Sequence, residues 1–369
     1  MTANVTGVVA TPNMNPIGWQ WMGPVANAWI VSRVLTASGL LIGAQIRVGR
    51  LSGHGFFEWD GKWYLQAAFS GYGPAPAAGH QSPWPFFPLL PGLLGILHAL
   101  RLPAGPIVIV ANHVLLAVAL IGVWHLASRR FNTDVANLSV WIVALFPISG
   151  VFSMLYPSAI FLAASVWAFE FAERRRWMLC GASACAAAAA RPNGVLIAIV
   201  LLAVVYRAET GDKRRVALLV VGGPAFCFLI AWSVFCAYET GNPFVFITAK
   251  AAWQEQTGIG LLRQLTTTPH FDSLYIHLVL GLTAAAFLTA AWTRLPRSWH
   301  ILAVITIILP FVSGLVGLGR YVIECFPFAI AGSAVLTHSP RRFRLATGTV
   351  AAVATIIISA TMAGRGLVP

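Results

Sequence analysis

The sequence predicts an all-α, polytopic membrane protein with about eleven transmembrane helices. Hydrophobic residues make up 58% of the 369 residues and charged residues only 9%, whereas a soluble domain carries roughly 25% charged residues. Apolar runs of about 18 to 20 residues recur along the chain, which is long enough to cross a hydrocarbon core. We therefore expect one transmembrane domain at 27–369, preceded by a loose Gly/Pro/Asn-rich segment at 1–26.

Length and hydropathy define the candidate spans. They are residues 28–48, 106–127, 135–154, 157–172, 177–190, 193–207, 216–237, 275–293, 298–317, 321–337 and 345–362. The further apolar stretch 86–100 contains Pro88 and Pro91 and is short for a span, so we expect it to be interfacial or re-entrant. Whether it crosses the membrane is left open by the sequence.

The basic residues test this layout. Five clusters lie in short loops: Arg129 and Arg130; Arg174, Arg175 and Arg176; Arg207, Lys213, Arg214 and Arg215; Arg294 and Arg297; Arg341, Arg342 and Arg344. All five fall on one side if 86–100 does not cross, and the positive-inside rule places that side in the cytoplasm. The long loops 49–105 and 238–274 then lie on the outer face. Topology thus accounts for the net charge of +13, and nucleic-acid binding is not expected. The five cysteines show neither paired spacing nor nearby His ligands, so no structural metal or disulfide is implied.

Two of the eleven acidic residues stand close together in the first outer loop. Glu58 and Asp60 lie among aromatic residues, and Lys62 follows Glu58 by four positions, which favours a supporting ion pair on an amphipathic surface helix. Asp60 before Gly61 is also a common turn or N-cap arrangement. The alternative is functional: a carboxylate in an aromatic setting at the membrane surface suits a general base that acts on a hydroxyl.

Three basic residues on the expected outer face are candidates for binding a phosphate. Arg191 precedes Pro192, which breaks a long apolar stretch, and an ionisable residue at such a point is a functional candidate or a snorkelling side chain. Arg320 begins another span and has Glu324 four positions later, so the two side chains have the spacing of an ion pair. Lys250 is expected on a second interfacial helix.

Four segments carry a resemblance. "WDGKWYLQAAFSGYG" followed by "FFPLLPGLL" is similar to the first outer loop of the PIG-V-like mannosyltransferases, which are multi-span glycosyltransferases of the GT-C type. The Tyr-Pro corner at Tyr156, the basic turn and the Arg-Pro break follow in the family's order. "GNPFVFITAKAAWQ" resembles its Gly-Asn/Asp-Pro loop and "GRYVIECFPFAIA" its late Arg-Tyr and Phe-Pro span. The resemblance runs from about residue 29 to about residue 337.

The resemblance implies a GT-C-like fold and an inverting transfer of a sugar, mannose in this family, from a polyprenyl-phosphate donor at the outer face of the plasma membrane. Asp60 maps to the catalytic base, and Glu58 to the supporting acid or a contact with the acceptor. Arg191, Arg320 and Lys250 would hold the donor phosphate. Sugar and lipid would contact the aromatic residues Trp59, Trp63, Tyr64, Phe86, Tyr156 and Tyr321.

Other properties of the reaction stay open. The acceptor hydroxyl is left among a glycolipid, a glycan and a protein, and other sugars remain alternatives to mannose. No cofactor is required, although a divalent cation is left open, and the oligomeric state cannot be read from the sequence. Two other functions are alternatives. A lipid or sugar transporter or flippase is expected to carry ionisable residues near the bilayer midplane and repeated halves. A non-catalytic subunit of a cell-envelope assembly predicts that Asp60, Arg191 and Arg320 are dispersed in space.

Overall fold

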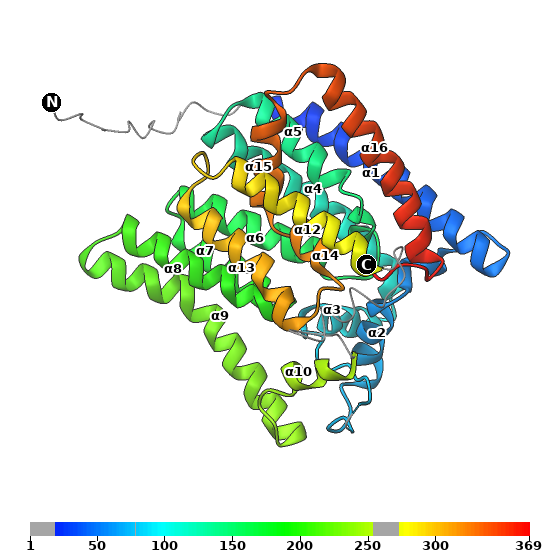
Figure 1. The fold of residues 1–369 in the computed structure, drawn as a ribbon. Coiled ribbons are helices and arrows are strands. Elements are labelled where there is room, and N and C mark those ends of the chain that lie inside the picture. Colours follow the sequence, from blue (N-terminus) through cyan, green and yellow to red (C-terminus); the bar gives the residue numbers. More distant parts are fainter. Residues whose placement is uncertain (1–18, 78, 254–272) are drawn as a thin grey trace.

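The computed structural model describes residues 19–77, 79–253 and 273–369. All regular secondary structure in these residues is helical (Figure 1). Their bounds are α1 Met22–Val48, α2 Asp60–Ser70, α3 Leu89–Ala99, α4 Ala104–Arg130, α5 Thr133–Ala144, α6 Ser158–Glu173, α7 Trp177–Ala190, α8 Val195–Ala208, α9 Gly211–Thr240, α10 Val245–Thr248, α12 Ser273–Ala290, α13 Arg297–Ser313, α14 Leu318–Ile323, α15 Phe326–Leu336 and α16 Arg341–Ala363.

The chain is an integral membrane protein. Within the described residues, five helices are long and apolar enough to cross a bilayer: Trp19–Val48, Ala104–Arg130, Gly211–Thr240, Ser273–Ala290 and Arg341–Ala363. The other predicted runs are also helical, but as shorter pieces, so the expected count of eleven spans is not confirmed. The run 135–154 stops being an α-helix after Ala144, and the run 321–337 is divided between α14 and α15.

The predicted boundary at the N-terminus differs from the structure, whereas the stretch 86–100 is as short as expected. Helix α1 already begins at Met22, inside the segment expected to be loose, and residues 1–18 lie outside the described residues. The stretch 86–100 forms α3, whose 11 residues extend over about 16 Å and are too short to cross a bilayer. Of the second long loop, the described part holds the short helix α10 and a 3-10 turn, Ala249–Trp253.

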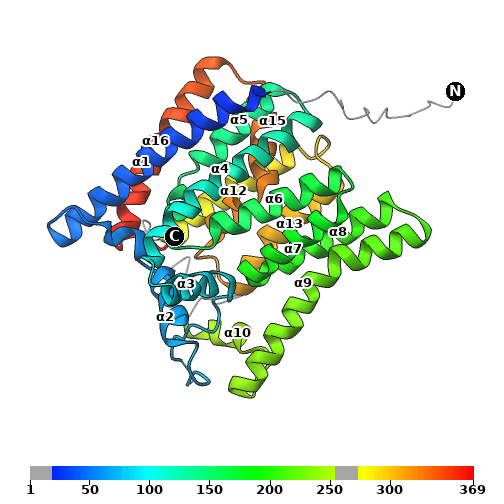
Figure 2. The ribbon, with the colours of Figure 1, turned by 180° about the vertical axis from the view of Figure 1, so that it is seen from behind.

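The first and last long helices lie side by side in both views (Figures 1 and 2). Gly39 and Gly43 allow this close approach. A Cβ at Gly43 would lie 2.0 Å from the Ala360 carbonyl oxygen, and one at Gly39 would lie 2.5 Å from the Ile356 carbonyl oxygen. This is the spacing of small residues by which membrane helices pack closely. The contact fixes the end of α16 beside the loop that follows α1.

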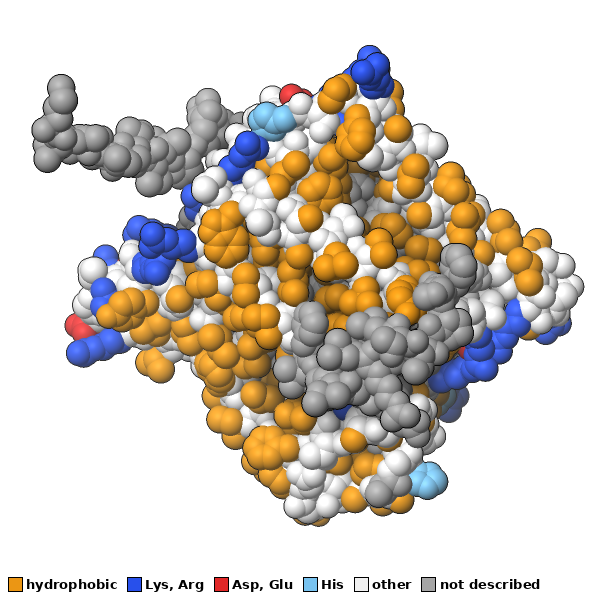
Figure 3. Space-filling model, in the orientation of Figure 1, with side chains coloured by type: hydrophobic (Ala, Val, Ile, Leu, Met, Phe, Trp, Pro, Cys, Tyr) orange, Lys and Arg blue, Asp and Glu red, His pale blue; other side chains and the backbone are white. Residues whose placement is uncertain are grey.

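The two ends of the bundle differ in character. Arg130 pairs with Glu173 at 2.6 Å, which joins the ends of α4 and α6, and Arg175 approaches Glu209 at 3.6 Å, which joins the next turn to the α8–α9 connection. Helices α2 and α3 pack together at the opposite end. Figure 3 shows apolar side chains over most of the visible bundle, with Lys and Arg gathered towards its edges. This is the distribution of a membrane protein with charged ends.

Candidate active site

A tight turn places the two outer-loop acids on different neighbours. The Gly61 N–H donates to the Glu58 carbonyl oxygen at 3.2 Å, which closes a four-residue turn. Trp59 occupies its second position with φ 57° and ψ −124°, a conformation that glycine adopts easily and a bulky side chain does not. The Trp59 indole N–H donates to the Met362 carbonyl oxygen at 2.9 Å. The end of α16 thus holds a strained turn, and strained backbone of this kind concentrates at functional sites.

Glu58 is buried and is surrounded by basic side chains. Its carboxylate is fully buried and lies 2.6 Å from the Arg47 guanidinium, 3.1 Å from Lys62 Nζ and 3.0 Å from Arg365 Nε. The His54 ring nitrogen lies 2.6 Å away. Burial raises the pKa of Glu58, but hydrogen bonds from Lys62, Arg47 and Arg365 outweigh it and lower the pKa below its ordinary value of 4.5. Glu58 is therefore an ionised anchor that ties α1, α2 and the C-terminal tail together.

Asp60 has other neighbours than Glu58 and pairs with Arg320. The Arg320 guanidinium donates to Asp60 Oδ2 at 2.6 Å, and both side chains are partly exposed, at 16% and 23%. The Asp60 backbone N–H donates to the Tyr156 hydroxyl at 3.0 Å, and the Arg320 guanidinium lies 5.4 Å from the centre of the Tyr156 ring. Tyr156 therefore supports both partners of the ion pair from below.

Arg191 forms a second and more deeply buried ion pair. It lies where Pro192 separates α7 from α8, and its guanidinium donates to Glu324 Oε2. The two side chains are 8% and 1% exposed. The Arg191 guanidinium also lies 6.0 Å from the ring centres of Phe161 and Tyr321. Arg320 and Glu324 have the predicted ion-pair spacing, but each binds a partner from elsewhere in the sequence instead of the other.

The short helix α14 joins the two pairs, because Arg320 lies on it and Glu324 follows its last residue, one turn further along. Four charges, Asp60, Arg320, Glu324 and Arg191, thus alternate in sign and sum to zero. Burial raises the pKa of the Tyr64 hydroxyl above its ordinary value, and the charges of all four groups also act on it. The residues that the sequence nominated from three distant segments therefore converge at one end of the bundle.

The surroundings of the Asp60–Arg320 pair keep Arg320 charged and Tyr156 neutral. Burial lowers the pKa of Arg320, but the Asp60 carboxylate and other nearby groups raise it further, so Arg320 stays charged. Burial is the main reason why the pKa of Tyr156 is raised well above its ordinary value. The Tyr156 hydroxyl is therefore neutral, and its oxygen accepts the hydrogen bond from the Asp60 backbone N–H.

Two polar atoms of the cluster are buried without a hydrogen-bond partner among the described residues. These atoms are Arg320 Nε and Glu324 Oε1. Glu324 and Tyr321 line a small cavity beside Asn193, with a volume of about 10 Å³, which is close to the room that one water needs. Spare donor and acceptor capacity therefore remains at the centre of the charged cluster.

Aromatic side chains form a wall beside the ion pairs. Trp63 stacks on Phe86 with ring centres 6.2 Å apart, and Tyr64 meets the same ring edge-on at 5.0 Å. Tyr64 and Phe86 are buried, whereas Trp63 is partly exposed. Of these three rings, only that of Trp63 therefore has part of its surface exposed.

The structure does not join Lys250 to this cluster. Lys250 lies in the 3-10 turn after α10, and no hydrogen bond or ion pair links it to the described residues. Its neighbour Ala249 packs in a separate aromatic group with Trp84 and Trp232. The predicted contact of Lys250 with a donor phosphate therefore has no support from these contacts.

The residues do not fit a divalent-cation site of the usual kind. Among the described residues, no three side chains of His, Cys, Asp or Glu lie together, and hard cations bind several oxygen ligands. Asp60 is paired with a guanidinium, and Glu58 is enclosed by basic groups. The reaction proposed for this site therefore uses the side chains alone.

Sequence reasoning missed several contributors. Arg365 and Arg47 bind Glu58, and Met362 anchors Trp59. Nothing in the local sequence around them signals a site, because each acts through the packing of α1 against α16. The only available sequence signal was the glycine spacing that permits this packing.

Comparisons with known proteins bear on the fold. No protein-family model and no curated protein sequence matches the chain. Among solved structures, the chain is similar to the oligosaccharyltransferase of Archaeoglobus fulgidus. In the apo form the identity is 12% and the TM-score 0.58, over 96% of this chain and 57% of that one. For the form tethered to an acceptor peptide, the identity is 14% and the TM-score 0.51, over 96% of this chain and 56% of that one. For the complex with Zn and sulfate, the identity is 15% and the TM-score 0.52, over 94% of this chain and 53% of that one.

The chain shares its fold with that oligosaccharyltransferase. It spans a little more than half the length of those chains. At this level of identity the likeness concerns the arrangement of helices. It agrees with the GT-C-like architecture that the sequence resemblance implies, while membership of the PIG-V-like family is not confirmed.

Proposed function

We propose that the protein is an inverting glycosyltransferase that moves a sugar from a polyprenyl-phosphate donor to a hydroxyl acceptor. The observation that carries this proposal is the convergence of Asp60 and Arg320, which are 260 positions apart, at 2.6 Å. A carboxylate and a guanidinium next to a second Arg and an aromatic wall are the groups that such a transfer needs. The likeness in fold to an oligosaccharyltransferase supports the same class of reaction.

In the proposed reaction Asp60 is the general base. The acceptor hydroxyl oxygen attacks the anomeric carbon of the sugar and gives its proton to the Asp60 carboxylate. The bond between that carbon and the phosphate oxygen breaks on the opposite face, and polyprenyl phosphate leaves with the electron pair. The configuration at the anomeric carbon is thereby inverted, and the negative charge on the departing phosphate is met by Arg320 and Arg191.

The Asp60–Arg320 pair gives the reaction an order. Arg320 cannot bind a phosphate with its whole guanidinium while it is paired with Asp60. Asp60 cannot accept a proton efficiently while it is paired with Arg320. A donor phosphate competes with the carboxylate for the guanidinium, because Arg binds both groups in the same geometry. Donor binding therefore releases Asp60, and the acceptor reacts second.

The surrounding residues take supporting roles in this proposal. Glu58 is too enclosed to contact an acceptor, so it positions the turn that carries Asp60. Tyr156 is likewise a positioning residue, because its hydroxyl binds the Asp60 backbone. Trp63 provides an accessible aromatic surface for the sugar or the isoprenoid chain, with Trp59, Tyr64, Phe86 and Tyr321 around it.

The finer assignments rest on the sequence resemblance. These are mannose as the sugar, the outer face of the plasma membrane as the location, a glycolipid, glycan or protein hydroxyl as the acceptor, and a phosphate contact from Lys250. The convergence of Asp60, Arg191 and Arg320 favours an enzyme over a non-catalytic subunit, which predicts that these residues are dispersed in space.

A transfer assay tests the proposal. The purified protein in lipid is incubated with radiolabelled polyprenyl-phosphate mannose and a membrane lipid extract, beside Asp60→Asn. Asp134→Asn is the matched control, because Asp134 is exposed and lies in the first turn of α5. We expect Asp60→Asn to reduce transfer by about 100-fold or more and Asp134→Asn to leave it unchanged. Equal transfer by all three proteins would remove Asp60 from the mechanism, and the absence of transfer with mannose and other polyprenyl-phosphate sugars would count against a transferase.

A further inference from the structure

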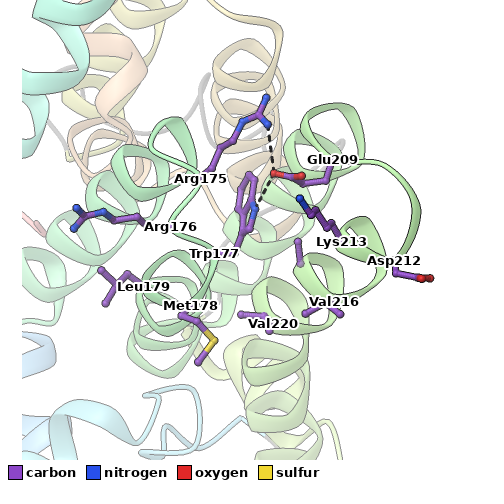
Figure 4. Close-up of a pocket in the computed structure, with 11 residues that line it drawn as sticks. Arg175, Arg176, Trp177, Met178, Leu179, Glu209, Asp212, Lys213, Val216 and Val220 are labelled. Carbon is purple, nitrogen blue, oxygen red and sulfur yellow. Dashed lines mark hydrogen bonds and ion pairs between the residues drawn. The ribbon is translucent and has the colours of Figure 1, made fainter. Parts of the chain in front are cut away.

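A groove lies at the end of the bundle opposite to the candidate active site. It has a volume of about 820 Å³ and is formed by the first turns of α7 and α9 with the residues that precede them (Figure 4). Helix α6 starts beside the active-site residue Tyr156 and ends just before the groove, so the two sites are separated by the length of that helix. The groove therefore plays no direct part in the proposed transfer.

Helix packing closes the groove on the side nearer the bilayer centre. A Cβ at Gly181 would lie 2.0 Å from the Val220 carbonyl oxygen, so α7 and α9 touch backbone to backbone at this level. The groove lies between that contact and the charged ends of the two helices. Its depth is thus fixed by a rigid contact.

The wall of the groove is apolar. Met178 and Val216 are 73% and 60% exposed, and Ala217 and Val220 line it as well. These residues belong to apolar helices of a membrane protein. The wall therefore faces hydrocarbon, and an acyl chain is the natural filling.

The rim of the groove is positively charged. Glu209 accepts a hydrogen bond from the Trp177 indole at 3.1 Å and is approached by Arg175 at 3.6 Å. Arg176 and Lys213 also line the groove and have no ion pair with any described residue. Three basic residues, Arg175, Arg176 and Lys213, therefore line the groove together with Glu209.

The second nearby acid does not offset this charge. Asp212 also lines the groove, but its side chain is 94% exposed and pairs with Arg215 at 3.4 Å, and this partner offsets its charge. The rim consequently carries a net charge of two positive units next to an apolar wall. An aromatic ring, Trp177, lies at the boundary between the two, which is where Trp is enriched at membrane surfaces.

We propose that this groove binds an anionic glycerophospholipid, with its phosphate at the basic rim and an acyl chain along Met178, Val216 and Val220. A basic pocket between membrane helices with an apolar continuation is the arrangement that recognises anionic lipid headgroups. A phosphatidylcholine headgroup carries its own cation, which the rim repels. The groove therefore selects for lipid charge, and its occupant bridges α7 and α9.

Native mass spectrometry of the full chain in detergent, titrated with phosphatidylglycerol or phosphatidylcholine of equal chain length, tests the proposal. We expect more bound phosphatidylglycerol than phosphatidylcholine, and we expect Arg176→Gln with Lys213→Gln to lower the affinity for phosphatidylglycerol by about tenfold or more. The matched control is Arg341→Gln with Arg342→Gln, which removes two exposed charges at the start of α16 and should change nothing.

A second variant tests the groove independently of its charge. Val216→Trp fills the apolar part and keeps every basic residue, so it should also weaken phosphatidylglycerol binding. Equal affinity for both lipids in the unmodified protein would overturn the proposal. So would equal losses in the two double variants, which indicate attraction to surface charge in general, or undiminished binding by Val216→Trp, which places the lipid elsewhere. Unchanged phosphatidylcholine binding in each variant serves as the check of folding.

Discussion

Asp60 and Arg320 lie 260 positions apart in the sequence, and their side chains meet at 2.6 Å. The ion pair joins the first outer loop to α14, and through Glu324 it connects to Arg191. Each partner is partly exposed, so a ligand can exchange with either of them. We regard this exchange as the central event of the proposed mechanism, and the predictions below examine its parts.

Replacement of Arg320 should weaken binding of the donor. Arg320→Gln removes a guanidinium from the proposed phosphate site, and we expect KM for the polyprenyl-phosphate sugar to rise and kcat to fall by about 100-fold. Arg320→Lys keeps the charge but loses the bidentate geometry, so its KM and kcat should lie between those of the unmodified protein and those of Arg320→Gln. Steady-state kinetics at varied donor concentration measure both effects. A KM and kcat unchanged in Arg320→Gln would exclude this residue from the phosphate site.

The buried Arg191–Glu324 pair should contribute strongly to the stability of the fold. Glu324→Gln leaves a buried guanidinium without its counter-charge, and breaking such a pair costs about 3–5 kcal/mol. We expect a clearly lower thermal unfolding temperature in detergent. Arg191→Met combined with Glu324→Leu replaces the pair with apolar groups and should recover most of the loss. If the double variant is as unstable as Glu324→Gln, the loss reflects packing and not an unpaired charge.

The strained turn at Trp59 predicts an unusual order of stabilities. Trp59→Ala loses the indole hydrogen bond and keeps a side chain at positive φ. Trp59→Gly loses the same bond but relieves the backbone strain, so it should be more stable than Trp59→Ala by about 1 kcal/mol. Both should reduce transfer, because Asp60 follows directly in the turn. Thermal unfolding of the two variants decides the point, and equal stabilities would show that the turn is not strained.

Glu58 predicts a loss of stability in acid. Its pKa is lowered in the folded protein from its ordinary value of 4.5, so its contribution is fully present above about pH 5 and disappears as pH falls through the lowered pKa. Unfolding temperatures measured from pH 7 to pH 3 should therefore fall less steeply for Glu58→Gln than for the unmodified protein, from a lower starting value. Parallel curves would mean that Glu58 does not titrate in this range.

The sequence predicted the class of fold and the central residues of the site for physical reasons that can be identified. Hydropathy specifies which segments are helical and apolar, so every predicted run contains a helix. It does not specify where a run breaks, because breaks such as the one after Ala144 depend on tertiary packing. Charge scarcity made Asp60, Arg191 and Arg320 conspicuous, since each ionisable residue in such a chain carries a high cost.

The partners of these residues were harder to predict. Glu324 lies four positions after Arg320, and local spacing favours a pair between them, whereas the fold gives each a distant partner. Arg365 and Arg47 reach Glu58 only because α16 packs on α1, and such long-range contacts leave no local pattern. The same argument applies to Tyr156, whose hydroxyl accepts a hydrogen bond from the distant Asp60 backbone N–H, while its contact with sugar or lipid stays a prediction.

The most direct test of the central claim is the equilibrium affinity of Asp60→Asn for a polyprenyl-phosphate sugar, measured together with its rate of transfer. If the donor phosphate and the Asp60 carboxylate compete for Arg320, the variant should bind the donor at least as tightly as the unmodified protein while it transfers almost no sugar. A loss of donor binding that matches the loss of transfer would contradict the account, because it would show that Asp60 helps to build the donor site instead of acting as the base that the donor releases.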